Sequence, residues 1–230
     1  MFGKLKNLLR RNKLTERLMT NYGFRTIIFS VCSLMTGIAY AVFNLAVGLI
    51  YRSLWYGALA CYYVMLDVIR GGVLVNRFKS SKRGEVSQRL YEIRQYLICG
   101  ALLIVMTVFL AAMVLHIARQ NKTFEYSLSV IYMTAGYTFY RIAVSVYNFV
   151  KSGKQSDFTV RALRCVNLVT ALVSFLSLQS AALTAFSKNL NRSYMNALTG
   201  GIVCLLIVIT GVFMIIRAGV RLKRERTASE

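Results

Sequence analysis

The chain has 230 residues, of which 57% are hydrophobic and only 16% are charged. A soluble domain carries about 25% charged residues, so the composition argues against a soluble globular protein. The net charge of +21 is gathered in short clusters between long apolar stretches, which is typical of a membrane protein with basic loops and does not indicate nucleic-acid binding.

The first 22 residues are a basic segment that precedes any apolar stretch. At 100° per residue, Phe2, Leu5, Leu8 and Leu9 share one helical face, and lysines and arginines flank it. This pattern predicts a short amphipathic helix on the inner membrane surface, where anionic headgroups attract its charge. Docking on a partner protein is the alternative. The apolar stretch that follows has spanning length and no small-residue cleavage site, so we expect a retained helix and not a signal peptide.

Six apolar stretches of about 20 residues follow, and an α-helix of that length crosses about 30 Å of hydrocarbon. The chain contains no proline that would break these helices. The sequence therefore predicts an all-α, polytopic membrane domain over 23–218, followed by a basic cytoplasmic tail over 219–230. The predicted spans are 26–50, 54–75, 96–118, 128–150, 164–186 and 196–217.

Lys and Arg are unevenly distributed over the segments between these spans. Most of them lie before the first span, after the second, after the fourth and after the sixth. Because such residues stay on the cytoplasmic side, both termini are predicted to be cytoplasmic in a multi-pass protein of the cell membrane. The spans then form three hairpins with short outer turns at 51–53, 119–127 and 187–195.

Asp67 is the one acidic residue deep in a predicted span, where an ionised group is costly and needs a partner. Arg141 lies at equal depth, because it follows Leu128 at the same interval as Asp67 follows Leu54. An interhelical Asp67–Arg141 pair is therefore one prediction. Arg70, one turn nearer the cytoplasm, is expected to extend toward the inner headgroups in preference to sharing the carboxylate.

Tyr63, Asn167 and Thr170 complete the candidate polar site around these charges. Asn167, Thr170, Ser174 and Ser177 recur at intervals of three and four, which places them on one helical face. Such a stripe either lines a hydrated cavity or hydrogen-bonds across a helix interface. The charged residues accordingly form either a structural ion pair or a gate or substrate site.

Three stretches of the chain resemble parts of the cation diffusion facilitator family. NLAVGLIYRSLWYGALACYYVMLDVI (44–69) resembles its first hairpin, and SDFTVRALRCVNLVTALVSFLSLQSAAL (156–183) resembles the start of its fifth helix. MNALTGGIVCLLIVITGVFMIIRAGVRL (195–222) is similar to its sixth helix. The resemblance implies a six-span, transporter-like bundle with both ends inside the cell.

The residues that carry metal in that family are missing here. The matching positions hold Tyr62, Leu66, Val166 and Thr170, and the sole histidine, His116, lies near the outer end of the third span. A zinc site needs four such ligands, so we expect no metal and no other cofactor. The family's cytoplasmic metal-binding domain is not expected either, because the chain ends shortly after the sixth span.

Two functions remain open from the sequence. No catalytic motif is present, so we expect no enzyme. The chain is either a transporter of unknown substrate without the usual zinc site, or a non-transporting membrane scaffold or accessory subunit that docks a membrane partner or a second copy. A water-filled cavity that reaches Asp67 would indicate transport, and a dry, tightly packed bundle would indicate the scaffold.

Overall fold

The computed structural model describes residues 22–80, 85–119, 127–151, 158–186 and 192–227. Within these ranges the chain forms six α-helices and no strand, which confirms the all-α prediction. The predicted amphipathic segment over 1–22 lies almost wholly outside the described residues, as do residues 228–230 of the tail. The helices are α3 (Tyr22–Ile50), α4 (Leu54–Ser80), α5 (Glu85–Arg119), α6 (Leu128–Lys151), α7 (Phe158–Phe186) and α8 (Arg192–Thr227).

Most helices extend beyond the predicted spans. α5 begins at Glu85, although its predicted span begins at residue 96, and α8 continues to Thr227 through most of the predicted tail. Hydropathy marks only the part of a helix that is apolar enough for hydrocarbon. Lys, Arg and Glu are good helix formers, so charged residues continue the same helix past the apolar part.

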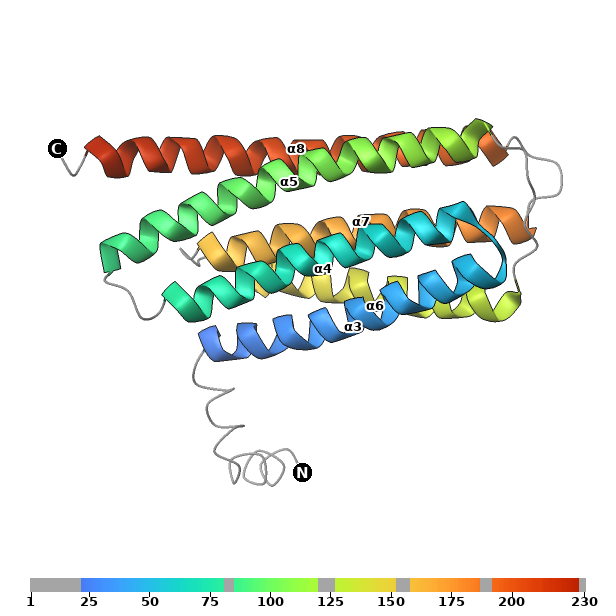
Figure 1. Ribbon diagram of the computed structural model, residues 1–230, viewed down its shortest axis with the longest axis horizontal. Helices are drawn as coiled ribbons and strands as arrows, with labels where there is room; N and C mark the ends of the chain where they lie inside the picture. Colours follow the sequence, from blue (N-terminus) through green and yellow to red (C-terminus); the bar gives the residue numbers. More distant parts are fainter. Residues whose placement is uncertain (1–21, 81–84, 120–126, 152–157, 187–191, 228–230) are drawn as a thin grey trace, which may run out of the picture.

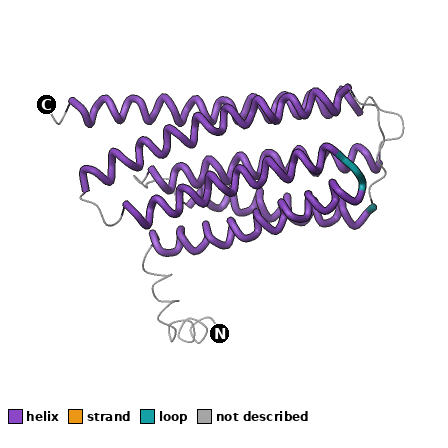
Figure 2. The backbone as a smooth tube through the Cα atoms, viewed as in Figure 1, coloured by secondary structure: helices purple, strands orange, loops and turns teal. Residues whose placement is uncertain are grey.

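The turn between α3 and α4 is the predicted outer turn at residues 51–53, drawn as a loop in Figure 2. The Ser53 amide donates to the Gly48 carbonyl at 2.9 Å, and the Arg52 amide donates to the Leu49 carbonyl at 3.4 Å. Arg52 has a φ of 47°, so these bonds form a Schellman C-cap with an arginine in the position that glycine usually takes. The cap ends α3 and reverses the chain within three residues.

The six helices alternate in direction, so the first residues of α3 and the last residues of α8 lie at the same end of the bundle (Figure 1). Helices α3, α4, α6 and α7 group together, and the α5–α8 pair lies along the α4 and α7 side of that group (Figure 1). The predicted hairpins hold only in part. α3 packs closely on α4, but α5 packs on α8 and α6 packs on α7, while α5 and α6 make little or no contact. Which helices pack together depends on how well their surfaces fit, including helices far apart in the sequence. The length of the loops between them does not predict it.

Five helices are long and apolar enough to cross a membrane, over Val31–Ile50, Leu54–Asn76, Gln88–His116, Phe158–Ala185 and Tyr194–Glu225. Their outward faces are apolar; for example, Met35, Leu49 and Val108 are each more than half exposed. An apolar surface of this extent would cause aggregation in water and is expected in lipid. The chain is therefore a membrane protein.

Helix α6 is the exception among the predicted spans. Its 24 residues give it a length of about 36 Å, which suits a crossing, but it is not one of the five helices that meet the apolar criterion. Arg141 and four tyrosines lower its mean hydropathy. The charged side chain of Arg141 is buried inside the bundle, whereas Met133, Phe139 and Val146 face outward. The helix is thus polar toward the protein and largely apolar toward its surroundings.

The α5–α8 pair is held at short range by small residues. A Cβ atom added at Gly211 would lie 3.0 Å from the Gly100 carbonyl oxygen and 2.8 Å from the Ile104 side chain. A Cβ atom added at Gly200 would lie 2.4 Å from Val114. Such close approach is the usual basis of helix association in lipid, where the hydrophobic effect does not drive one helix onto another.

We expect Gly211→Val to separate α5 from α8 and to lower the thermal unfolding midpoint of the purified protein in detergent. Overpacking of this kind costs about 1–3 kcal/mol, which corresponds to a decrease of roughly 5 °C. Gly219→Val on the same helix is the control, because no atom lies within 4 Å of a Cβ at that position. An equal decrease for both variants would contradict the close contact.

Candidate functional site

Arg70 of α4 is the centre of a buried polar cluster. Its Nη1 donates to Asp67 Oδ1 at 2.9 Å and to the Ser33 carbonyl oxygen at 3.1 Å. Its Nη2 donates to Asn167 Oδ1 at 2.9 Å and to Thr170 Oγ1 at 3.1 Å. The four acceptors come from α3, α4 and α7, so one guanidinium joins three helices. The side chain is 0% exposed.

Arg141 of α6 reaches the same place from the opposite side. Its Nη1 donates to Ser33 Oγ, and its Nη2 donates to the Ser33 carbonyl oxygen at 3.0 Å. Its Nε donates to the Tyr137 hydroxyl at 2.6 Å, and its guanidinium also lies over the Tyr137 ring. The Ser33 carbonyl oxygen therefore accepts from both arginines, and the two positive charges converge on one turn of α3.

Asp67 lies against the backbone of α3 at Gly37. A Cβ atom added at Gly37 would lie 2.3 Å from both carboxylate oxygens of Asp67. The glycine thus makes room for the carboxylate. It also stands one turn after Ser33, so no side chain at that position covers the carbonyl on which the two arginines meet.

These contacts correct two predictions. The sequence predicts that Arg70 extends to the inner headgroups, but the structure buries it and bonds it to Asp67. The suggested Asp67–Arg141 pair is not formed among the described residues, because Arg141 bonds to Ser33 and Tyr137. Arg70 stands one turn from Asp67 on the same helix, so this pair forms without any match in depth between two helices.

Three tyrosines close the cluster on the side of the α3–α4 turn. The Tyr40 and Tyr137 rings are stacked with centroids 3.5 Å apart, and Tyr63 meets Tyr40 edge-on at 4.9 Å. Tyr63, predicted as part of the site, therefore packs beside the arginines without a described bond to them. On the other side, Val73, one turn after Arg70, and Val166, one turn before Thr170, are fully buried.

The predicted polar stripe of α7 is a buried interface. Its residues are all nearly inaccessible, and Ser174 accepts a hydrogen bond from Thr138 Oγ1 of α6 at its carbonyl oxygen, at 3.0 Å. α6 contributes a matching stripe that the sequence reasoning missed, and two of the tyrosines on this helix, Tyr132 and Tyr140, face outward. The buried polar residues of this second stripe are Thr134, Thr138, Arg141 and Ser145.

α3 also carries a polar face that the sequence reasoning missed. Ser33, Gly37, Tyr40 and Asn44 recur at intervals of four, three and four, which is the spacing of one helical face. The helix is so apolar overall that hydropathy alone identifies it as a span. The few polar residues of this face do not stand out in an average over the whole span. Ser33 and Gly37 supply the backbone surface on which both arginines and Asp67 meet.

The cluster carries more positive than negative charge. Two guanidiniums, 0% and 2% exposed, face one carboxylate that is 7% exposed. Among the described residues, no three His, Cys, Asp or Glu side chains come together as metal ligands. Tyr62, Leu66 and Val166, at the family's ligand positions, are buried in the apolar core, and Thr170 binds Arg70. A divalent cation near Asp67 would be repelled by both arginines.

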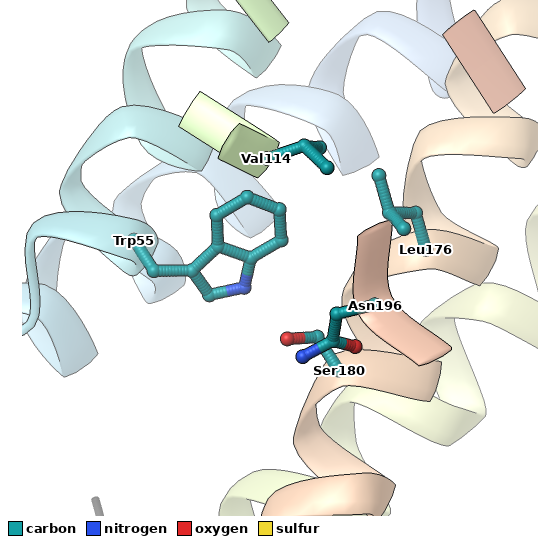
Figure 3. Close-up of a pocket in the computed structure, with 5 residues that line it drawn as sticks. All are labelled: Trp55, Val114, Leu176, Ser180 and Asn196. Atoms are coloured by element: carbon teal, nitrogen blue, oxygen red, sulfur yellow. The ribbon is translucent and has the colours of Figure 1, made fainter. Parts of the chain in front are cut away.

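Two hollows lie at the ends of the bundle, away from these charges. One has a cavity volume of about 10 Å³, room for about one water, and Figure 3 shows its polar side chains on one side and its apolar ones on the other. Its lining residues are Trp55, Val114, Leu176, Ser180 and Asn196. The second, at the end where α5 and α7 begin and α8 ends, has a cavity volume of about 210 Å³ and is lined by charged residues. Neither hollow is lined by Asp67 or Arg70.

A comparison with protein-family models and with curated proteins found no match to this chain. The resemblance to cation diffusion facilitators therefore stays a prediction from the three quoted stretches.

We expect Gly37→Ala to force the Asp67 carboxylate away from α3 and to disrupt its pair with Arg70. The free energy of unfolding, measured by denaturant titration in mixed micelles, should fall by about 3 kcal/mol. Gly72→Ala on α4, two residues after Arg70, is the matched control, because a Cβ there would meet no atom within 4 Å apart from the nearby backbone of its own helix. Equal stability of the two variants would show that Asp67 has no fixed place on α3.

Proposed function

We propose that all six helices cross the cell membrane, with both termini in the cytoplasm. The alternating helix directions and the inward-facing charge of α6 support a sixth crossing. Arginines near the starts of α5 and α7 and the end of α8 support a cytoplasmic position for that end of the bundle, among them Arg89, Arg94, Arg161, Arg164, Arg217 and Arg221.

Epitope tags on the two termini test this arrangement in sealed right-side-out vesicles. Both tags should resist added protease, because the cytoplasmic side of the membrane faces the lumen of such vesicles and six crossings place both termini on that side. A tag inserted in the predicted outer turn at 187–195 is the control and should be digested. Digestion of one terminal tag would establish an odd number of crossings, such as the five helices identified by composition alone.

Within that arrangement, the protein is a non-enzymatic membrane scaffold or accessory subunit that works without a cofactor. The observation that carries this proposal is the complete burial of Arg70 among acceptors from three helices. A charge at this depth costs about 3 kcal/mol unless it is bonded. A helix that moved away would leave donors unmatched, so the cluster favours one fixed packing over alternating states.

The outward face of α6 supports a docking role for this scaffold. Tyr140 is 42% exposed and adjoins Arg141 in the sequence, so it lies at the depth of the cluster but on the lipid-facing side. A tyrosine hydroxyl in mid-membrane gains from a hydrogen-bond partner, and tyrosine is enriched at protein interfaces. A second copy of the chain or a membrane partner would supply such a surface.

The second candidate is a transporter with a layout like that of the cation diffusion facilitators. The excess of guanidinium over carboxylate in the cluster favours it, because Arg141 bonds only neutral groups among the described residues. The sign of this excess favours an anion as the substrate. Transport would require the tyrosines and valines that flank the cluster to separate.

Asp67→Asn separates the two candidates, with Arg94→Gln, an exposed charge change on α5, as the control. For the scaffold, the variant should lose about 3 kcal/mol of unfolding free energy, and the double variant Asp67→Asn/Arg70→Gln should recover part of that loss because the charge of Arg70 is no longer buried without its carboxylate. For the transporter, Asp67→Asn should remain folded but change chloride flux into proteoliposomes. A stable Asp67→Asn protein would contradict the scaffold proposal.

A further inference from the structure

The hollow between α5, α7 and α8 brings together arginines from three helices. Arg89 comes from the start of α5, Arg161 from the start of α7, and Arg221 from the end of α8. In Figure 1 this is the left end of the bundle, where α8 stands apart from the start of α7. The cavity volume of about 210 Å³ exceeds that of a single water several-fold, so an ion or headgroup can enter.

The charge around this hollow is positive. Two carboxylates, Glu92 and Glu225, also line it. Glu92 is buried and accepts a hydrogen bond from Gln88 at 3.2 Å. Arg164, Arg217 and Arg221 are close enough to Arg161 for their charges to repel its charge. Arg164 and Arg217 do not line the hollow, so they add two positive charges near it. The positive groups thus outnumber the negative ones.

Aromatic contacts hold one of these arginines in place. The guanidinium of Arg161 lies over the Phe158 ring at 5.6 Å from its centroid. Phe158 in turn packs edge-on against Tyr96 of α5, with centroids 5.6 Å apart. The ring fixes the plane of the guanidinium, and the shape of a guanidinium matches the oxygens of phosphate.

The hollow also lies at the right depth for a headgroup. Its lining residues stand at the ends of three helices that are apolar enough to span the membrane, over Gln88–His116, Phe158–Ala185 and Tyr194–Glu225. The place is therefore where the apolar part of each helix gives way to its charged part. Basic pockets between helices at this level are suited to anionic lipid headgroups.

We infer that the hollow lined by Arg89, Arg161 and Arg221 binds a phosphate group, carried by a lipid headgroup or free in solution. Arg89 and Arg221 are exposed and approach from two helices, so a phosphate between them would join α5 to α8 at their charged ends. This site does not depend on whether the central cluster is a structural lock or a transport site, nor on whether α6 crosses the membrane.

The test is the thermal unfolding midpoint of the full chain in uncharged detergent. Phosphatidylglycerol in mixed micelles and sodium phosphate are the two probes, and phosphatidylcholine and sodium chloride at equal ionic strength are their controls. We expect one of the probes to raise the midpoint by about 5 °C more than its control. A rise with lipid alone assigns the site to a headgroup, and a rise with phosphate alone assigns it to the free ion.

Arg89→Gln and Arg94→Gln form a matched pair for this measurement. Both residues are exposed on α5 and both variants lose one positive charge, but only Arg89 lines the hollow. Arg89→Gln should raise the probe concentration that gives half of the rise in the midpoint about tenfold, and Arg94→Gln should leave this concentration unchanged. Arg221→Gln should repeat the effect of Arg89→Gln from α8. Equal weakening by Arg94→Gln, or no rise with either probe, would overturn the inference.

Discussion

A guanidinium inside an apolar bundle needs hydrogen-bond acceptors from the protein, and this need accounts for how the four central helices meet. Both terminal nitrogens of Arg70 find acceptors, whereas its Nε has none among the described residues. Arg70 finds its acceptors on α3, α4 and α7, so these helices must lie at fixed depth and rotation. Gly37 gives the Asp67 carboxylate a place on α3. Arg141 brings α6 to the same turn through Ser33.

The α5–α8 pair follows a different principle. Its contact depends on the absence of side chains at Gly100 and Gly211, and its outward face is apolar over most of its length. Dispersion at close range holds these two helices together, whereas the other four are joined by buried polar bonds as well as by close packing. The pair also carries most of the positive charge of the hollow at its ends, with Arg89 on α5 and Arg221 on α8. Close packing joins the two helices only along their apolar part. A phosphate in the hollow would join them at their charged ends as well.

The excess of positive charge at the centre does not suit a divalent cation. Asp67 stands close to a position where the cation diffusion facilitators carry a ligand, but two arginines surround it. The negative charge of this carboxylate is balanced by the neighbouring guanidinium, so it would attract a cation only weakly. The resemblance predicted from the three stretches therefore does not extend to the metal-binding chemistry of that family.

The sequence by itself determined the helical class, the position of the apolar stretches and the polar face of α7. These follow from period and hydropathy, which are local properties of the chain. Only the tertiary structure decided that α5 packs on α8, that Arg70 binds Asp67 within one helix, and that Ser33 receives both arginines. The physical reason is that hydropathy reflects side chains only. It cannot show that the Ser33 carbonyl oxygen will accept hydrogen bonds, or that the absence of a side chain at Gly37 makes room for a carboxylate. Both effects appear only when a neighbouring helix brings a charge against these positions.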